Sequence, residues 1–293
     1  MLSVAFLLKL CYYEGNKPKE GERMKVVLSR KGMDSASGGI PSLILPDGTL
    51  LSLPIPDAES GLGYEEITYK GLSYKEIIHQ LHPSFDFETY PCCHLDPDLY
   101  DVLKNRPENW KPAFGQCGVS AKHLDKLGVG VGDVFLFYGM FQPTEYRPNG
   151  TLTYKKKAPV QHIIYGYLRV GEVLKESSKI KECYPWHPHA MGSFRTDDRL
   201  YLPADYGVFS YDRKLLLTKP GQPNRRLWSL PAFFAESGIS ISWQGENRPT
   251  LVNGRAELNS VCRGQEFVVT AETPELEREL GRWVENLTGR AEK

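Results

Sequence analysis

The sequence predicts an α+β protein with a mixed, mostly antiparallel sheet that is partly barrel-like, a few short helices and a C-terminal amphipathic helix. Three observations predict this class. Apolar β-type segments recur along the chain, helical periodicity is confined to short stretches, and a capped amphipathic helix is the last clear element. The chain has no internal repeat and no low-complexity linker, so we expect one domain over residues 24–290.

Residues 1–23 are set apart from this domain. The apolar stretch 2–13 lacks the charged start and the small-residue cleavage site of a signal peptide, and Lys9 interrupts it. Residues 19–23 can be encoded entirely by purines, as in a bacterial ribosome-binding site, and Met24 then opens a clean strand. We therefore predict that translation starts at Met24 and that residues 1–23 are a misassigned start or a loose tail.

The domain begins with a strand, a polar loop and a hairpin. Residues 25–29 form the apolar strand, and the loop that follows is rich in glycine and charge. The turn residues 46–48 then lie between the two hairpin strands, at 42–45 and 49–53.

Two short helices come next. Ser73 opens a capping box, and its helix should end at Pro83. Residues 83–113 contain many prolines, so we expect a long, ordered and mostly irregular segment there. Residues 120–127 form the second helix, which Gly128 ends.

The strongest strand signal lies in the middle of the chain. The buried strand 134–138 should pair with the strand 162–170, and residues 148–151 provide a hairpin-type turn. Shorter strand-like segments follow at 199–202, 215–218, 239–243 and 266–269.

The last helix has clear ends. Thr273 is its N-cap, Pro274 is its first residue, and Gly289 stops it. Its apolar face consists of Leu276, Leu280, Trp283, Val284 and Leu287.

The composition excludes some classes of function. Lys plus Arg and Asp plus Glu both number 36, so no global field draws the protein to nucleic acid, and any such contact must be local. The six cysteines show neither a CxxC motif nor a disulfide framework, which indicates reduced thiols and a cytoplasmic protein. No apolar run is long enough to cross a bilayer, so we expect no membrane partner.

The polar loop after the first strand is the first candidate site. Its glycines let backbone amides approach a ligand, its two cations suit a phosphate or carboxylate, and Asp34 could act as a base. The alternative is a surface loop whose glycines serve tight turns. The candidate residues are Ser29, Arg30, Lys31, Gly32, Asp34, Gly38, Gly39 and Ser42.

The second candidate site is the segment of His94, Asp96 and Asp98. In an extended chain these side chains point to one side, where they could bind a divalent cation or share acid–base work. The alternative is a turn, because Asp before Pro commonly initiates one. No cofactor is specified beyond this candidate cation.

Other candidates are more scattered. Gln116 and His123 lie at the second helix, where Gln116 could position a ligand. Arg225 and Trp228 join a cation to an aromatic ring that could stack on a base, although a core tryptophan is the alternative. The remaining cysteine and histidine residues match no recognised zinc spacing, and His189 more simply makes a structural or ligand hydrogen bond.

Several stretches of the sequence carry a family resemblance. They are residues 28–34, 38–42, 45–50, 94–99, 114–116, 123–124 and 131–137. Together they resemble the nucleotide modification associated domain 3 family of bacteria and phages, from Met24 to about Leu287. The resemblance implies a place in DNA or nucleotide base modification, with a nucleotide or nucleic acid as ligand and other base-modification proteins as partners. It implies no particular reaction.

Two hypotheses follow for the function. In the first, an enzyme acts on a nucleotide or nucleobase: Arg30 and Lys31 hold phosphate, while Asp34 and the segment at 94–98 do acid–base or metal work. In the second, a non-catalytic module recognises a modified base or nucleic acid through the same residues. The two differ in turnover.

Overall fold

A ten-stranded sheet forms the centre of the fold in this computed structural model, which describes residues 23–58, 60–191, 197–262 and 264–289. The main path of the sheet runs through β14 (Ile239–Ile241), β17 (Glu266–Ala271), β1 (Val26–Arg30), β9 (Val134–Tyr146), β11 (Gln161–Leu174), β12 (Arg199–Val208) and β8 (Phe114–Gln116). Off this path lie β10 (Leu152–Tyr154), β2 (Ser42–Ile44) and β3 (Leu50–Leu51). Only the pairs of β9 with β1 and β2 are parallel among the strands described, so the predicted α+β class with a mostly antiparallel sheet is confirmed.

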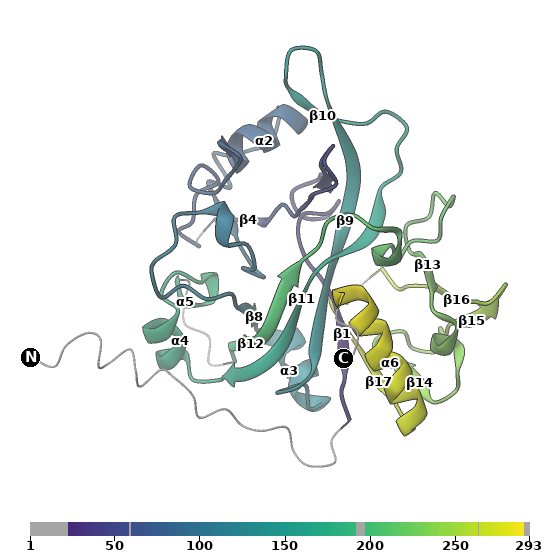
Figure 1. Cartoon of the computed structure of the whole chain (residues 1–293). Coiled ribbons are helices and arrows are strands. Elements are labelled where there is room, and N and C mark those ends of the chain that lie inside the picture. The colour runs from purple at the N-terminus through teal and green to yellow at the C-terminus, as the bar shows by residue number, and fades with distance from the viewer. Residues whose placement is uncertain (1–22, 59, 192–196, 263, 290–293) are drawn as a thin grey trace, which may run out of the picture.

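Smaller elements surround this sheet. The small sheets comprise β13 (Leu227–Leu230), β15 (Thr250–Val252) and β16 (Arg255–Asn259), then β4 (Ile55–Asp57) with β7 (Cys92–His94), and β5 (Thr68–Tyr69) with β6 (Leu72–Ser73). The helices are α2 (Tyr74–Leu81), α3 (Gly118–Lys126), α4 (Ser177–Cys183), α5 (Pro188–Met191) and α6 (Pro274–Thr288), with 3-10 turns at Asp101–Leu103, Arg213–Leu215 and Ala232–Ala235. In Figure 1, α6 and the β13–β16 sheet lie on one side of the long strands, and α2, α4 and α5 lie on the other.

The sheet curls like a half-barrel, and one hydrogen bond demonstrates the curl. β8 is the last strand of the main path, whereas β17 lies near its opposite end. Even so, Gln116 Nε2 of β8 donates to Glu266 Oε1 of β17 at 2.6 Å. The concave interior between them is filled by aromatic rings, including Phe114, Phe135 and Tyr201. Polar side chains from distant strands are therefore brought together at the ends of the curl.

The polar loop is an excursion between two strands that share one edge of β9. Residues 26–30 of β1 pair in parallel with the first part of β9, and residues 42–44 of β2 pair in parallel with its second part. The chain leaves the sheet after Arg30 and rejoins the same edge at Ser42. Lys31 O approaches Gly139 so closely that a Cβ on that glycine would lie 2.6 Å away. The loop is thus fixed at both ends to the central strand.

The helix-end signals in the sequence are confirmed at two helices. Ser73 caps α2 through a complete capping box with Glu76. Thr273 caps α6, which carries Pro274 in its first turn and ends at Gly289 in the left-handed conformation. The helix predicted at 120–127 begins earlier, at Gly118, because Cys117 takes the N-cap position without a side-chain cap bond.

One predicted strand is wrong, and several elements were not predicted. Residues 215–218 form no continuous strand: Leu215 ends a 3-10 turn that Asp212 caps, while Leu216 and Thr218 form isolated β-bridges with Ile163 and Trp228. The small sheet β13–β16–β15 and the helices α4 and α5 were not predicted. Residues 1–22 lie outside the described residues, so the start of translation at Met24 stays a prediction. None of the described helices is both long and apolar enough to span a membrane.

Candidate functional site

Asp96 is the meeting point of three histidines. Its carboxylate lies 3.4 Å from His187 Nε2, 3.8 Å from His189 Nε2 and 4.0 Å from His94 Nε2. The Asp96 side chain is 4% exposed and the His187 side chain is fully buried. We call His94, Asp96, His187 and His189 the Asp96 cluster. Three imidazoles around one buried carboxylate form an arrangement able to move protons or bind a cation.

Two further carboxylates lie behind the histidines. Asp198 Oδ1 is 2.8 Å from His189 Nδ1, and Asp57 Oδ2 is 3.4 Å from His94 Nδ1. Each of these rings therefore has Nδ1 beside an outer carboxylate and Nε2 turned toward Asp96. A carboxylate at one nitrogen fixes the orientation of a histidine ring and its tautomer.

Four separate parts of the fold position the Asp96 cluster. His94 ends β7, which pairs with β4, the strand that carries Asp57. His187 and His189 come from the start of α5, which packs on β8 and β12 through a small apolar cluster that includes Ile180, Tyr184, Ala190 and Leu200. Asp96 is held by Gly115 N of β8, which donates to its Oδ1 at 2.8 Å.

Gly115 also makes room for His189. A Cβ on this glycine would lie 2.1 Å from His189 Cδ2, closer than real Cβ contacts allow. Only glycine therefore lets the imidazole lie against β8 while the amide of the same residue holds Asp96.

Burial and neighbouring charges give Asp96 and His189 different protonation states. Burial alone would raise the pKa of Asp96, but contact with His187 and the nearby His189 and Lys31 bring that pKa well below its usual range. Burial lowers the pKa of His189, and this outweighs the opposite effects of Asp198 and Asp96. At neutral pH the cluster therefore contains an ionised carboxylate beside a neutral imidazole.

A second polar group joins the polar loop to this cluster. Glu266 Oε1 accepts hydrogen bonds from Ser29 Oγ at 3.1 Å, from Lys31 Nζ at 3.1 Å and from Gln116 Nε2 at 2.6 Å. Glu266 is 1% exposed, and its second oxygen has no hydrogen-bond partner among the described residues. We call these four residues the Glu266 network. Because the charge of Lys31 lowers the pKa of Asp96, the two groups are electrostatic neighbours.

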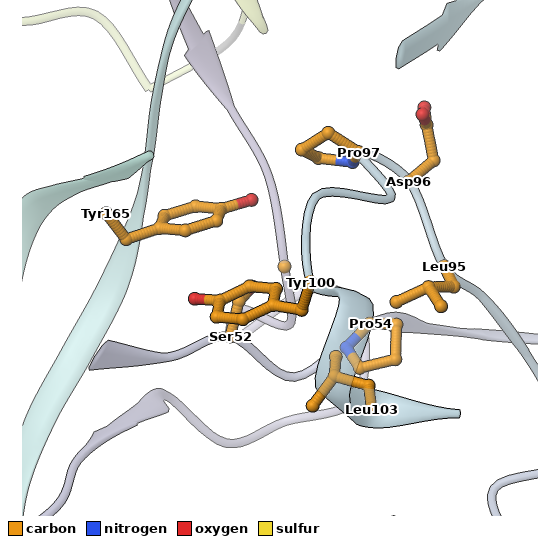
Figure 2. Close-up of a pocket in the computed structure, with 9 residues that line it drawn as sticks. Ser52, Pro54, Leu95, Asp96, Pro97, Tyr100, Leu103 and Tyr165 are labelled. Atoms are coloured by element: carbon orange, nitrogen blue, oxygen red, sulfur yellow. The ribbon is translucent and has the colours of Figure 1, made fainter. Parts of the chain in front are cut away.

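A small hollow lies next to Asp96, on the side away from its carboxylate (Figure 2). Tyr100 and Tyr165 present their rings to it, Gly32 of the polar loop contributes backbone, and the Asp96 carboxylate points away from Tyr100 and Leu103. The hollow contains about 270 Å³ of space between atoms. The enclosed cavity within it is about 10 Å³, room for about one water molecule and far below the roughly 300–1,000 Å³ of typical small-molecule pockets, so a nucleotide would have to bind on the surrounding surface.

Most of the chain matches one family. The family model described as nucleotide modification associated domain 3 matches residues 25–270. The chain belongs to this nucleotide modification associated domain 3 family. The resemblance noted in the sequence is thereby confirmed, and the family's name associates its domain with nucleotide modification systems without naming a reaction. None of the curated proteins and none of the solved structures matches the chain.

Within this family member, Asp98 lies apart from the cluster. Arg106 binds both of its carboxylate oxygens, at 2.7 and 2.6 Å, and Trp110 Nε1 donates to one of them. The expected convergence at 94–98 is met by His94 and Asp96 and not by Asp98. The physical reason is that β7 ends at His94, so the alternation of an extended strand does not continue to Asp98.

The polar loop contributes to the site in part. Lys31 lies in the Glu266 network and Gly32 lines the hollow, whereas Arg30 turns to the other side and donates to Cys262 O at 3.2 Å. Asp34 holds its own loop by accepting from Ala36 N and Ser37 N.

The other loop candidates shape or stabilise the loop itself. Gly38 and Gly39 adopt positive φ angles of 82° and 78°. Ser42 is fully buried and accepts a hydrogen bond from Leu53 N.

The remaining candidates lie elsewhere. His123 pairs with Ser242 Oγ at 2.9 Å and packs against Trp243. Trp228 is fully buried and donates to His162 Nδ1, which is the core position that the sequence left open as the alternative. Arg225 lies near His162, whose pKa is lowered first by burial and then by the charges of Arg225, Arg30 and Arg226.

Sequence reasoning missed much of the site. His187 and His189 were noted for a zinc spacing that they do not match, and His189 also for a hydrogen bond, while Asp57, Asp198 and Glu266 carried no signal. The closeness of His187 and His189 in sequence was the one usable sign. The other contacts depend on pairings over long sequence separations, such as Gln116 with Glu266.

Proposed function

We propose that this chain is an enzyme of a nucleotide modification system and that it acts on a nucleotide or nucleobase at the Asp96 cluster. The observation that supports it is the set of three histidines around one buried carboxylate. A carboxylate that only stabilises the fold is best paired with arginine, as Asp98 is with Arg106. Titratable partners around a buried acid are instead typical of reactive sites.

The surroundings suit a ligand of this class. Lys31 and Gln116 are fixed beside the cluster by Glu266, where they can orient polar groups of a base. Away from the Asp96 cluster, the charges of Arg30, Arg225 and Arg226 all act on His162. Such a local group of arginines suits phosphate and supplies the contact that the balanced net charge does not.

In this proposal Asp96 stays ionised, the Nε2 atoms of His94 and His189 face the reacting group, and Asp198 holds the His189 ring through Nδ1. Gly115 fixes Asp96 and His189 relative to β8.

Nucleoside mass spectrometry tests the proposal. DNA and nucleotide pools from cells with and without the gene should differ in at least one modified nucleoside. The purified protein should convert the corresponding nucleotide, and His189→Gln should lower that rate at least about 100-fold. The matched control is His79→Gln, because His79 is an exposed residue of α2. Binding of the nucleotide without conversion would favour the non-catalytic alternative.

A further inference from the structure

We propose that the Asp96 cluster holds one divalent transition-metal ion, with His94, Asp96 and His189 as its ligands. This inference rests on the proposed function, since it names the ion with which the same site would work. It goes beyond the sequence hypothesis, which grouped His94 and Asp96 with Asp98.

The distances suit a common ion. One ligand atom each from His94, Asp96 and His189 lies within 4.8 Å of the others. Ligands about 2.1 Å from a tetrahedral zinc ion lie roughly 3.4 Å apart, whereas Asp96 Oδ2 lies 3.8 Å from His189 Nε2 and 4.0 Å from His94 Nε2, so binding would draw these atoms inward.

The orientation of the rings is that of metal ligands. His189 Nδ1 is engaged by Asp198, and His94 Nδ1 lies beside Asp57, so both Nε2 atoms are left for the centre. Histidines that bind a metal almost always present their second nitrogen to a carboxylate, a carbonyl or water. Two such pairs around one carboxylate are hard to explain by packing alone.

His187 holds the carboxylate in place. Its ring is fully buried, its Nδ1 accepts a hydrogen bond from His189 N at 3.3 Å, and its Nε2 lies 3.4 Å from Asp96 Oδ1. Because Nδ1 accepts, the proton of the neutral ring is on Nε2, so His187 faces Asp96 as a donor and not as a metal ligand. Asp96 Oδ2, which faces His94 and His189, is left for the ion.

Another set of possible ligands is less suitable. Cys117, His189 and Asp198 also lie within 4.8 Å of one another. In that set, however, the His189 nitrogen that faces Asp198 is Nδ1, which is already bound to Asp198 Oδ1 at 2.8 Å. The Nε2 side of His189, toward Asp96, is therefore the better binding position.

The donor set narrows the class of ion. Two imidazoles with one carboxylate suit zinc, iron(II) or a related first-row metal, whereas magnesium and calcium prefer oxygen ligands. Because these first-row ions share the same ligands, the choice among them is left to the experiment.

The test measures metal content directly. The full chain is stripped with chelator, loaded separately with Zn²⁺, Fe²⁺, Mn²⁺ or Mg²⁺, and analysed by elemental mass spectrometry and calorimetric titration. We expect about one ion per chain for at least one of the first three and weak binding of Mg²⁺. His94→Gln and Asp96→Asn should each weaken binding at least tenfold, and Asp198→Asn about 10–100-fold. His79→Gln should bind as the wild type does.

The outcomes are decisive in both directions. A stripped wild-type chain that binds none of the first-row ions overturns the inference, as does an Asp96→Asn variant with wild-type affinity. Circular dichroism verifies that each variant is folded, and Asp198→Asn gives the result if a ligand variant is not. A metal-free chain that converts a nucleotide overturns this inference and leaves the proposed function standing. A chain that binds metal but converts no nucleotide overturns the proposed function alone.

Discussion

Asp96 and Asp98 lie two residues apart in one loop, and both side chains are 4% exposed. Their partners differ completely. Asp98 is held by Arg106 and Trp110, which satisfy its oxygens with a permanent charge and an indole N–H. Asp96 faces three imidazoles, which can change charge or bind a cation. The comparison teaches that burial of a carboxylate does not identify a site, whereas the chemistry of its partners does.

The largest expected effect concerns stability at Asp98. Asp98→Asn should lower the free energy of unfolding by about 3–5 kcal/mol, because Arg106 would remain as a buried cation without its counter-charge. Guanidinium denaturation measures the change. The double variant Asp98→Leu with Arg106→Met should recover much of the loss, since it leaves no buried charge. A loss below about 1 kcal/mol in Asp98→Asn would contradict the structural role.

The next effect concerns the geometry around Asp96. Gly115→Ala should lower both turnover and metal affinity by about 100-fold, because its Cβ would displace His189 and disturb the amide that holds Asp96. The matched control is Gly281→Ala in α6, where the added Cβ meets no atom within 4 Å. That variant should gain up to about 1 kcal/mol of stability and keep the site unchanged. Equal behaviour of the two alanine variants would argue against the Asp96 geometry.

A third prediction concerns His162, a buried histidine that lies outside the Asp96 cluster. The ring of His162 is satisfied, since Nδ1 accepts from Trp228 Nε1 at 3.0 Å. Burial, with the charges of Arg225, Arg30 and Arg226, lowers its pKa to about 3.

The sign of the pH effect follows from this shift. The native state resists protonation of His162 while the unfolded chain binds a proton near pH 6.5, so stability falls as the pH drops below about 6.5. The loss from His162 should reach about 2 kcal/mol at pH 5. Denaturation curves at pH 7 and pH 5 for the wild type and His162→Gln check it. The variant should lose about 2 kcal/mol less, and identical pH profiles would sink the assignment.

The smallest effect concerns arginines outside the Asp98 pair. Whereas Arg106 is committed to Asp98, Arg225 and Arg226 are partly exposed and lie near Arg30. Replacing Arg225 and Arg226 by Gln should weaken nucleic-acid binding similarly for all sequences and reduce the salt dependence by about 2 in slope. Fluorescence anisotropy over a range of salt concentrations measures this. An unchanged slope would exclude these arginines as phosphate contacts.

Local signals predicted much of the fold. The capping box at Ser73, the helix ends at Thr273 and Gly289, and the apolar strands at 134–138 and 162–170 each depend on neighbouring residues, and the structure contains them all. The small sheet of β13, β15 and β16 was missed because its short strands are stabilised by pairing and not by a strong apolar pattern.

The site was predictable only in part, because it is assembled over long sequence separations. His94 and Asp96 were found through their spacing, yet His187 and His189 meet them only after α5 packs on β8 and β12. Glu266 lies opposite Ser29 through strand pairing. The sequence also grouped Asp98 with Asp96, and that part of the prediction was wrong for the same reason. The partners of Asp98 depend on the position of Arg106 and on where β7 ends.

The most direct test of this difference is the turnover rate of Asp96→Asn and Asp98→Asn, each measured per folded molecule on the nucleotide that the wild type converts. The account predicts that Asp96→Asn loses at least about 100-fold in rate. It predicts that the folded fraction of Asp98→Asn keeps a rate within a few-fold of the wild type. A nearly wild-type rate for Asp96→Asn, or an equal loss in both variants, would contradict the assignment of the Asp96 cluster as the reactive centre.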